Sequence, residues 1–219
     1  MAPLSPNFGD RRGGVRPSLI VLHYTAMASC DAALDRLCDP AAEVSAHYLI
    51  LETGEVLALV PEELRAWHAG AGGWRGLDDI NSRSIGIELA NNGAAPFAQA
   101  QMLALEALLA DVMARLAIGP EGLIAHSDLA PGRKADPGAR FDWRRLALGG
   151  FSVWPEGHDP RPTLDFVKDA RRFGYPDVGD DLVLAAFRLR FRPWAKGPLD
   201  AVDAGMIADL AARFGLESA

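Results

Sequence analysis

A run of aliphatic residues near the N-terminus limits the fold more than any other feature of the chain. Residues 18–25 read Ser-Leu-Ile-Val-Leu-His-Tyr-Thr, so four aliphatic residues stand in a row before His23. A strand that is apolar on both faces must be covered on both faces, and this run therefore predicts a central strand in a buried sheet. His23 at its end is either a hydrogen-bonded core histidine or a ligand at the carboxyl end of the strand.

Two later runs have the same form. Residues 84–90 predict a second strand, in which Glu88 interrupts an apolar sequence, and residues 123–127 predict a third strand that delivers His126. A lone carboxylate among aliphatic residues is costly to bury unless a partner, a metal or its own chemistry compensates. The alternative for Glu88 is an edge strand that turns the carboxylate toward water.

The loop after the third run carries two more polar side chains that could serve a reaction. Lys134 and Asp136 stand two apart, and extended residues at that spacing point to the same side. Asp136 precedes Pro137, which favours an extended backbone at the aspartate. An imidazole and a carboxylate together suit zinc or another borderline cation. The alternative is a solvated loop with a capping aspartate and a surface lysine.

The remaining patterns predict a compact first part and a smaller helical second part. Residues 149–162 contain three Pro and three Gly with little periodicity, which is typical of a linker, and His158 within them is expected to be a surface residue without a role. In the first part we expect a hairpin of residues 44–51 and 55–60, a helix from Ser29 to about Cys38, a long helix from Pro96 to about Ala117, and a short helix over 142–148. In the second part we expect amphipathic helices over 163–173, 179–191 and 201–214. The predicted division is a first domain over 1–155, a linker over 156–162 and a helical domain over 163–219, which would be marginal alone and should pack against the first.

The composition excludes several classes of function. Hydrophobic residues make up 49% and charged residues 23% of the 219, values typical of a soluble globular protein. The formal net charge is -7, and nine basic residues balance nine acidic ones after position 160. No segment therefore has the basic excess of a nucleic-acid binder, and no apolar run is long enough to span a membrane. The sequence does not indicate an oligomeric state.

The cysteines and the first residues indicate the compartment. Cys30 and Cys38 fall in one predicted helix, where about 12 Å would separate them at about 1.5 Å per residue, too far for a disulfide. The first fourteen residues offer neither the apolar segment of a signal peptide nor a cysteine for lipidation. Both observations predict a cytoplasmic protein. The alternative is an exported, periplasmic protein whose leader is missing from this sequence.

Five motifs occur in an order that resembles a known family. They are Leu22-His-Tyr-Thr25, Ser45-Ala-His47, Arg65-Ala-Trp-His-Ala-Gly70, Ser84-Ile-Gly-Ile-Glu88 and His126-Ser-Asp-Leu-Ala-Pro-Gly-Arg-Lys-Ala-Asp-Pro-Gly138. The chain is similar to the zinc-dependent N-acetylmuramoyl-L-alanine amidases of the AmpD/AmiD type, relatives of T7 lysozyme and the peptidoglycan recognition proteins. The resemblance covers roughly residues 5–155, and the tail resembles the helical, peptidoglycan-binding-like domain of AmiD. The chain departs from AmiD in lacking a leader and a lipobox cysteine, and from AmpD in having the tail.

The resemblance implies a fold and a set of functional residues. The fold would be α/β, with a central mixed β-sheet flanked by helices and a small all-α domain of three helices at the C-terminus. His23, His126 and Asp136 would hold zinc and leave its fourth position open, as in a catalytic site. Glu88 would act as general base and acid, and Lys134 would stabilise the oxyanion.

Five other residues are candidates for binding the substrate. His47 and His68 would support the ligands or line the cleft, with a core role as the alternative for both. Trp67 would form a wall of the cleft or part of the core. Arg133 would pair with a carboxylate of the stem peptide unless it is simply solvated. Asn91, in the turn after the second strand, completes the candidate substrate-binding set.

The implied reaction is hydrolysis of the amide between the lactyl group of (1,6-anhydro-)N-acetylmuramic acid and L-Ala of the stem peptide. With the predicted compartment, this is cytoplasmic recycling of muropeptides. Three alternatives stay open. They are an exported amidase that acts on intact peptidoglycan, a module that binds peptidoglycan without cutting it, and a domain whose zinc is closed by a fourth side chain such as His47.

Overall fold

The computed structural model describes residues 5–156 and 165–216. Its strands are β1 (Phe8–Asp10), β2 (Leu19–Tyr24), β3 (Tyr48–Ile50), β4 (Val56–Ala58), β5 (Leu64–Ala66), β6 (Ser84–Leu89) and β7 (Leu123–Ala125). Its α-helices are α1 (Cys30–Cys38), α2 (Ile80–Arg83), α3 (Gln99–Leu116), α4 (His126–Leu129), α5 (Trp143–Leu148), α6 (Phe166–Phe173), α7 (Asp180–Phe191) and α8 (Ala201–Phe214). Short 3-10 turns lie at 12–14, 40–42 and 120–122.

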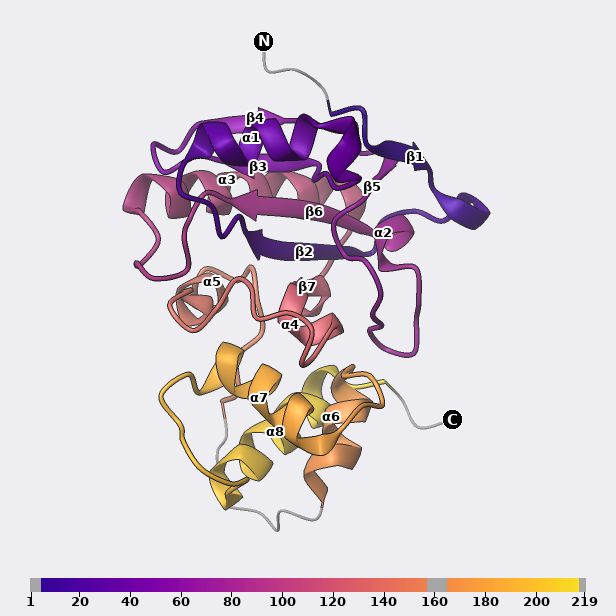
Figure 1. Ribbon diagram of the computed structural model, residues 1–219. Coiled ribbons are helices and arrows are strands. Elements are labelled where there is room, and N and C mark those ends of the chain that lie inside the picture. The colour runs from indigo at the N-terminus through magenta and orange to yellow at the C-terminus, as the bar shows by residue number, and fades with distance from the viewer. Residues whose placement is uncertain (1–4, 157–164, 217–219) are drawn as a thin grey trace.

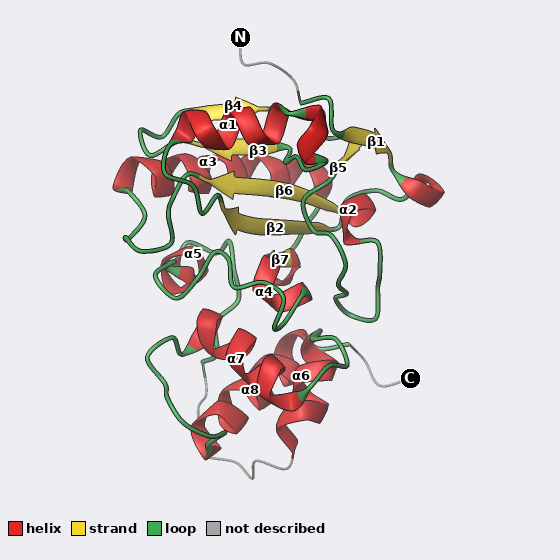
Figure 2. Ribbon diagram, in the orientation of Figure 1, coloured by secondary structure: helices red, strands yellow, loops and turns green. Residues whose placement is uncertain are grey.

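The five-stranded sheet is mixed, as predicted. Its strand order is β4-β3-β6-β2-β7, with β3, β6, β2 and β7 parallel and β4 antiparallel to β3. β1 and β5 form a separate antiparallel pair at one end. Figure 2 shows α1 in front of the sheet and α3 behind it, so the two helices cover opposite faces. Helices on both faces are what a parallel arrangement of apolar strands requires.

The back of the sheet forms an apolar core with α3. Ile20 and Leu22 of β2 alternate with residues of the front face, and they pack with Ile85 and Ile87 of β6. The buried residues of α3 follow a helical period, so one side of the helix covers these strands. They are Met102, Leu105, Leu109 and Val112.

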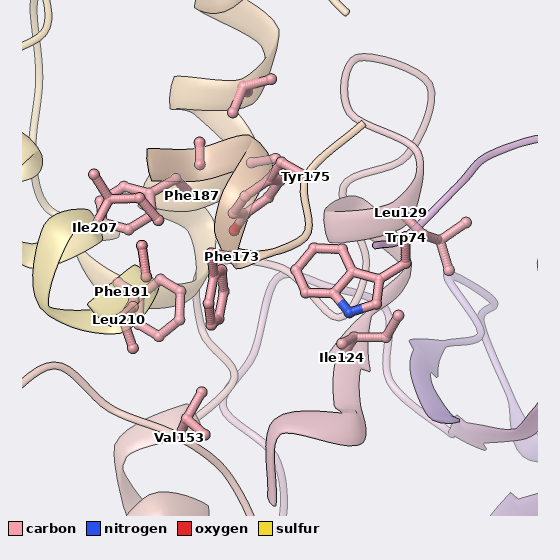
Figure 3. Close-up of a cluster of buried hydrophobic side chains, with 14 of the residues drawn as sticks. Trp74, Ile124, Leu129, Val153, Phe173, Tyr175, Phe187, Phe191, Ile207 and Leu210 are labelled. Atoms are coloured by element: carbon pink, nitrogen blue, oxygen red, sulfur yellow. The ribbon is translucent and has the colours of Figure 1, made fainter. Parts of the chain in front are cut away.

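The C-terminal helices lie beyond the β7 edge of the sheet, with α4 and α5 between them and the strands (Figure 1). They share one buried cluster with the first part of the chain. Figure 3 shows Phe173, Phe187 and Phe191 of the helices in the cluster that also contains Ile124 and Leu129. The helices and the sheet therefore exclude water from a common core, as expected for a segment too small to be stable alone.

Some predicted elements differ from the structure. The third strand ends at Ala125 rather than at 127, because β7 pairs only with β2 over three residues and the chain then turns into α4. The hairpin strands β3 and β4 are shorter than predicted, and His47 precedes β3 instead of lying within it. The edge-strand alternative for Glu88 is wrong, because β6 has a parallel neighbour on each side.

Other sequence expectations can be compared directly. Ser29 caps α1 by accepting a hydrogen bond from the amide of Ala32, as predicted. Cys30 and Cys38 lie at the two ends of α1 and are not joined by a disulfide. Of the linker predicted over 156–162, only Glu156 belongs to the described residues. His158 lies outside them. Within the described parts of the chain, no helix is both long and apolar enough to cross a membrane.

Candidate metal centre and cleft

The front face of the two central strands carries the polar side chains. Side chains two apart on a strand share a face, so His23 points away from the α3 core that holds Leu22. On β6 the same alternation places Ser84, Gly86 and Glu88 on the front face. His23 and Glu88 are partners in the parallel register, which makes the imidazole and the carboxylate neighbours. Neighbouring strands lie about 4.8 Å apart.

Three donor atoms meet at the carboxyl end of β2. His23 Nδ1 lies 2.8 Å from His126 Nδ1, and each of these nitrogens lies 2.9 Å from Asp136 Oδ2. His126 begins α4 directly after β7, and the amide of Ser127 donates to the backbone oxygen of Asp136 at 3.0 Å. Both imidazoles are almost fully buried. Residues 113 positions apart in sequence, His23 and Asp136, are thus brought into one triad.

Hydrogen bonds around His126 determine which of its nitrogens carries a proton. Its Nε2 lies 2.9 Å from the carbonyl oxygen of Ala69. A carbonyl only accepts, so Nε2 must donate. In a neutral imidazole, Nδ1 then has a free lone pair directed at the triad.

A longer chain of hydrogen bonds gives the same result for His23. The Ser84 hydroxyl donates to the carbonyl of Ile80 at 2.6 Å, so its oxygen accepts from His68 Nε2 at 3.2 Å. His68 Nδ1 is therefore free to accept from His23 Nε2 at 3.0 Å. His23 Nδ1 is then left with a lone pair. The chain Ile80–Ser84–His68–His23 thus fixes the tautomer of His23 in which Nδ1 is unprotonated, the form in which a neutral imidazole can bind a metal.

Both imidazoles and the carboxylate thus present lone pairs at less than 3 Å from one another, and such atoms repel unless a cation lies between them. Burial, with His126 as the second cause, lowers the pKa of His23 to about 4, so His23 itself does not carry a second proton at pH 7. These three residues are the metal-compatible group of His, Cys, Asp and Glu within the described ranges. Two nitrogens and one oxygen are a donor set that zinc accepts.

Glycine at position 86 is required by the position of His68. A Cβ at Gly86 would lie 2.4 Å from Cγ of the His68 ring. Burial lowers the pKa of His68 well below its ordinary value, so the ring that rests on Gly86 is neutral. Any side chain at position 86 would displace His68 and with it the hydrogen bond to His23.

Glu88 stands beside the triad without a fixed partner. Its Oε2 is buried and finds no hydrogen-bond partner in the part of the chain that the structure describes. Burial raises the pKa of Glu88 to about 8, and the nearby Asp136 carboxylate adds to the rise. A buried carboxyl group with a raised pKa and an unsatisfied oxygen in a cleft is the usual state of a residue that transfers protons.

The triad and Glu88 lie in a cavity of about 390 Å³. Lys134 and Arg133, both exposed, line it, and so do the half-buried Trp67 and His68. The Arg133 guanidinium donates to the carbonyls of Ala69 and Ala71, so this side chain is held at the rim of the cavity. The cavity therefore combines cationic and aromatic walls with the polar triad.

Two of the predicted substrate-binding residues lie elsewhere. His47 is fully buried, where its Nδ1 accepts from the amide of Gly86 at 2.9 Å and its Nε2 lies 3.1 Å from the carbonyl of Leu64. It is neither on the cavity wall nor a fourth ligand of the triad. Asn91 lines a neighbouring cavity, and its side-chain oxygen accepts from the amide of Gly93 at 2.7 Å. Both side chains fix local backbone.

Sequence reasoning missed two contributors to the site. Ser84 belongs to one of the five motifs but has no predicted role of its own, although it forms with Gly86 and Glu88 a series in which every second residue of β6 is not aliphatic. Arg36 of α1 is exposed and lines the cavity. Its position within an amphipathic helix carried no signal, because a solvated arginine on such a helix is ordinary.

A mixed sheet that brings two imidazoles and a carboxylate together beside a further carboxyl group has the side chains that the class of metal-dependent hydrolases uses. Comparison with known families identifies the particular family within this class. The family model of N-acetylmuramoyl-L-alanine amidase matches residues 13–139, and the chain belongs to this family.

The similarity to individual relatives extends over most of the chain. It is 37% identical to N-acetylmuramoyl-L-alanine amidase AmiD of Escherichia coli, over 91% of this chain and 84% of AmiD. The AmpD amidase of Salmonella typhimurium is 34% identical over 65% of this chain and 85% of its own length.

Two solved structures resemble this fold. The complex of Escherichia coli AmiD with anhydro-N-acetylmuramic acid-L-Ala-D-gamma-Glu-L-Lys has a TM-score of 0.83 and 34% identity, and it covers 96% of this chain and 99% of that one. The complex of AmpDh3 from Pseudomonas aeruginosa with anhydromuramic pentapeptide has a TM-score of 0.84 and 31% identity, with coverage of 94% and 95%. Both likenesses include the C-terminal helices.

Proposed function

We propose that the chain is a zinc-dependent amidase that removes stem peptides from muropeptides. His23, His126 and Asp136 would hold the metal and leave one position open. The observation that carries the proposal is the convergence of three lone pairs at 2.8–2.9 Å, with the tautomers set by Ala69 and by the His68–Ser84 chain. When bound, zinc supplies Lewis-acid chemistry, which polarises a carbonyl and favours the ionisation of water.

Glu88 would move the proton during hydrolysis. Its carboxylate takes a proton from the attacking water and then delivers it to the nitrogen of the leaving L-Ala, so the same oxygen acts as base and then as acid. The unpartnered Oε2 supports this role, because no other hydrogen bond has to break first. A cation in the triad would compensate the charge of Asp136, the second cause of the raised Glu88 pKa, and would favour the ionised form.

Lys134 would stabilise the negative charge that develops on the carbonyl oxygen. Its side chain lines the cavity from the loop that also carries Asp136, and its backbone is held by a hydrogen bond to the carbonyl of Ala130 at 3.0 Å. An ammonium group near a developing oxyanion contributes most when water is excluded. Arg133, Trp67 and His68 would contact the substrate around this centre, and Arg36 would add a second cationic contact for stem-peptide carboxylates.

We infer from the relatives which bond is hydrolysed. The amide would be the one between the lactyl group of anhydro-N-acetylmuramic acid and L-Ala, since the solved AmiD and AmpDh3 complexes hold anhydromuramic peptides. The presence of Glu88, Lys134 and all three ligands favours an enzyme over a module that only binds peptidoglycan. The cytoplasmic location stays a prediction, which fractionation of cells that express the native gene would test.

The products identify the reaction. We expect the zinc-loaded protein to convert anhydro-N-acetylmuramic acid-L-Ala-D-gamma-Glu-L-Lys into the free tripeptide and anhydro-N-acetylmuramic acid, each seen by mass spectrometry. Intact sacculi in a parallel incubation separate the two substrate classes, because recycling predicts much faster release from the soluble fragment. Release of peptide from sacculi alone would replace recycling with wall hydrolysis, and binding without release would make the chain a recognition module.

A further inference from the structure

The helical turn that carries His126 is too short to be stable without contacts from the rest of the protein. α4 spans only His126–Leu129, and isolated helices of this length are unstable in water. Its N-terminus is stabilised by Asp128, whose Oδ2 accepts from the amide of Ala125 at 2.9 Å. The same turn also holds the backbone of Asp136 through Ser127. The placement of two candidate metal ligands thus depends on Asp128.

Asp128 is completely buried, and its carboxylate accepts hydrogen bonds from residues of the C-terminal part of the chain. Arg190 of α7 donates from Nη1 to Oδ2 at 2.6 Å, and the Tyr175 hydroxyl donates to Oδ1 at 2.9 Å. An aspartate with no exposed surface keeps its charge only if a buried cation and hydrogen bonds compensate the loss of water.

Arg190 is inserted into the first part of the chain. Its side chain is 1% exposed, and its Nη2 donates to the carbonyl of Leu123 in β7 at 3.0 Å and to the Ser152 hydroxyl at 3.1 Å. The guanidinium carbon lies 4.4 Å from the centre of the Trp143 ring in α5. These contacts join α7 to β7, α4, α5 and Ser152, all of which belong to the first part of the chain.

A second contact connects the helices to the loop before β6. Tyr175 and Phe173 lie edge-on to Trp74, with ring centres 5.2 and 5.5 Å away (Figure 3). The amide of Gly73 in that loop donates to the carbonyl of Leu129 at 2.9 Å, at the end of α4. The turn that carries His126 is therefore held from the α7 side and from the Trp74 loop.

We propose that the C-terminal helices complete the metal centre, with Arg190 and Tyr175 as positioning residues that act on His126 through Asp128. The inference deepens the proposed function, because it rests on the proposed zinc site. It assigns the tail a task at the site itself, besides any contact with peptidoglycan. Neither residue touches the triad, so the effect must pass through the α4 turn.

The experiment compares two buried arginines of one helix. Arg190→Met removes the cation beside Asp128, whereas Arg188→Met removes the nearby buried cation that pairs with Asp203 inside the helical part. Both full-length proteins are stripped of metal and titrated with Zn²⁺ alone against a chromogenic chelator. We expect Arg190→Met to weaken zinc binding by at least about tenfold, the range found for residues that support metal ligands. Arg188→Met should lose thermal stability with zinc affinity within about twofold of the parent.

Two further variants keep the test decisive. Asp128→Asn combined with Arg190→Met removes both charges, and it should recover part of the lost affinity, since no uncompensated charge then remains. If Arg190→Met does not fold by circular dichroism, Tyr175→Phe carries the test with the absorption spectrum of bound Co²⁺ as a second reading, and we expect a changed spectrum. Equal zinc affinity in the Arg190 and Arg188 variants, or an unchanged affinity and spectrum in Tyr175→Phe, would overturn the inference. A parent protein that binds no zinc would refute the proposed function instead.

Discussion

Glu88→Gln is expected to lower kcat for amide cleavage by about a thousandfold while one zinc stays bound. The amide side chain matches the carboxyl group in size, so the front face of β6 keeps its packing, but it cannot take a proton from water at neutral pH. General acid–base catalysis by a positioned side chain contributes about 10²–10⁴ in rate, and here one residue would serve both proton transfers. Initial rates on the anhydromuramic tripeptide, together with the zinc content of the same sample, measure the effect.

A matched substitution separates chemistry from general damage. Glu106→Gln alters a carboxylate of α3 that pairs with Arg145, away from the cavity, and it should leave kcat within about twofold of the parent. A Glu88→Gln enzyme with near-normal turnover would remove Glu88 from the mechanism and would leave its buried, unpartnered oxygen unexplained.

His126→Ala is expected to abolish both zinc binding and activity. The substitution removes one of three ligand atoms and leaves His23 and Asp136 without a third donor, which is too few for a stable site at neutral pH. Metal content after dialysis, measured by atomic absorption, should fall from one zinc per chain to near zero.

His47→Gln is the control for the loss of an imidazole. Its ring nitrogens bond to Gly86 and Leu64 rather than to the triad, so the zinc content should stay at one per chain. A full complement of zinc in His126→Ala, or its loss in His47→Gln, would show that the ligand set is wrong.

Three chemistry-bearing residues could be predicted because each one interrupts or ends an aliphatic run. His23, Glu88 and His126 stand where burial makes a polar side chain costly, and the residue pattern alone shows that cost. The alternatives left open at that stage depended on strand order. Glu88 would face water if β6 were an edge strand. The structure excludes this because β6 has a parallel strand on each side, and such long-range pairing cannot be read from a local sequence pattern.

The supporting residues could not be predicted in the same way. Arg190 lies in an apolar stretch of α7, and a sequence pattern does not show whether it turns to solvent or into the core. Its partner Asp128 is 62 positions away, so the pair exists only once the helices pack beyond β7. Ser84 and Gly86 gain their meaning from the His68 ring, which comes from another loop.

Titrating the metal-free protein with zinc while following amide cleavage tests the central claim most directly. The account predicts that the rate on the anhydromuramic tripeptide rises linearly with added Zn²⁺ and levels off at one equivalent per chain, as three ligands with one open position require. Cleavage at full rate by the metal-free protein, or no cleavage with one zinc bound per chain, would contradict it.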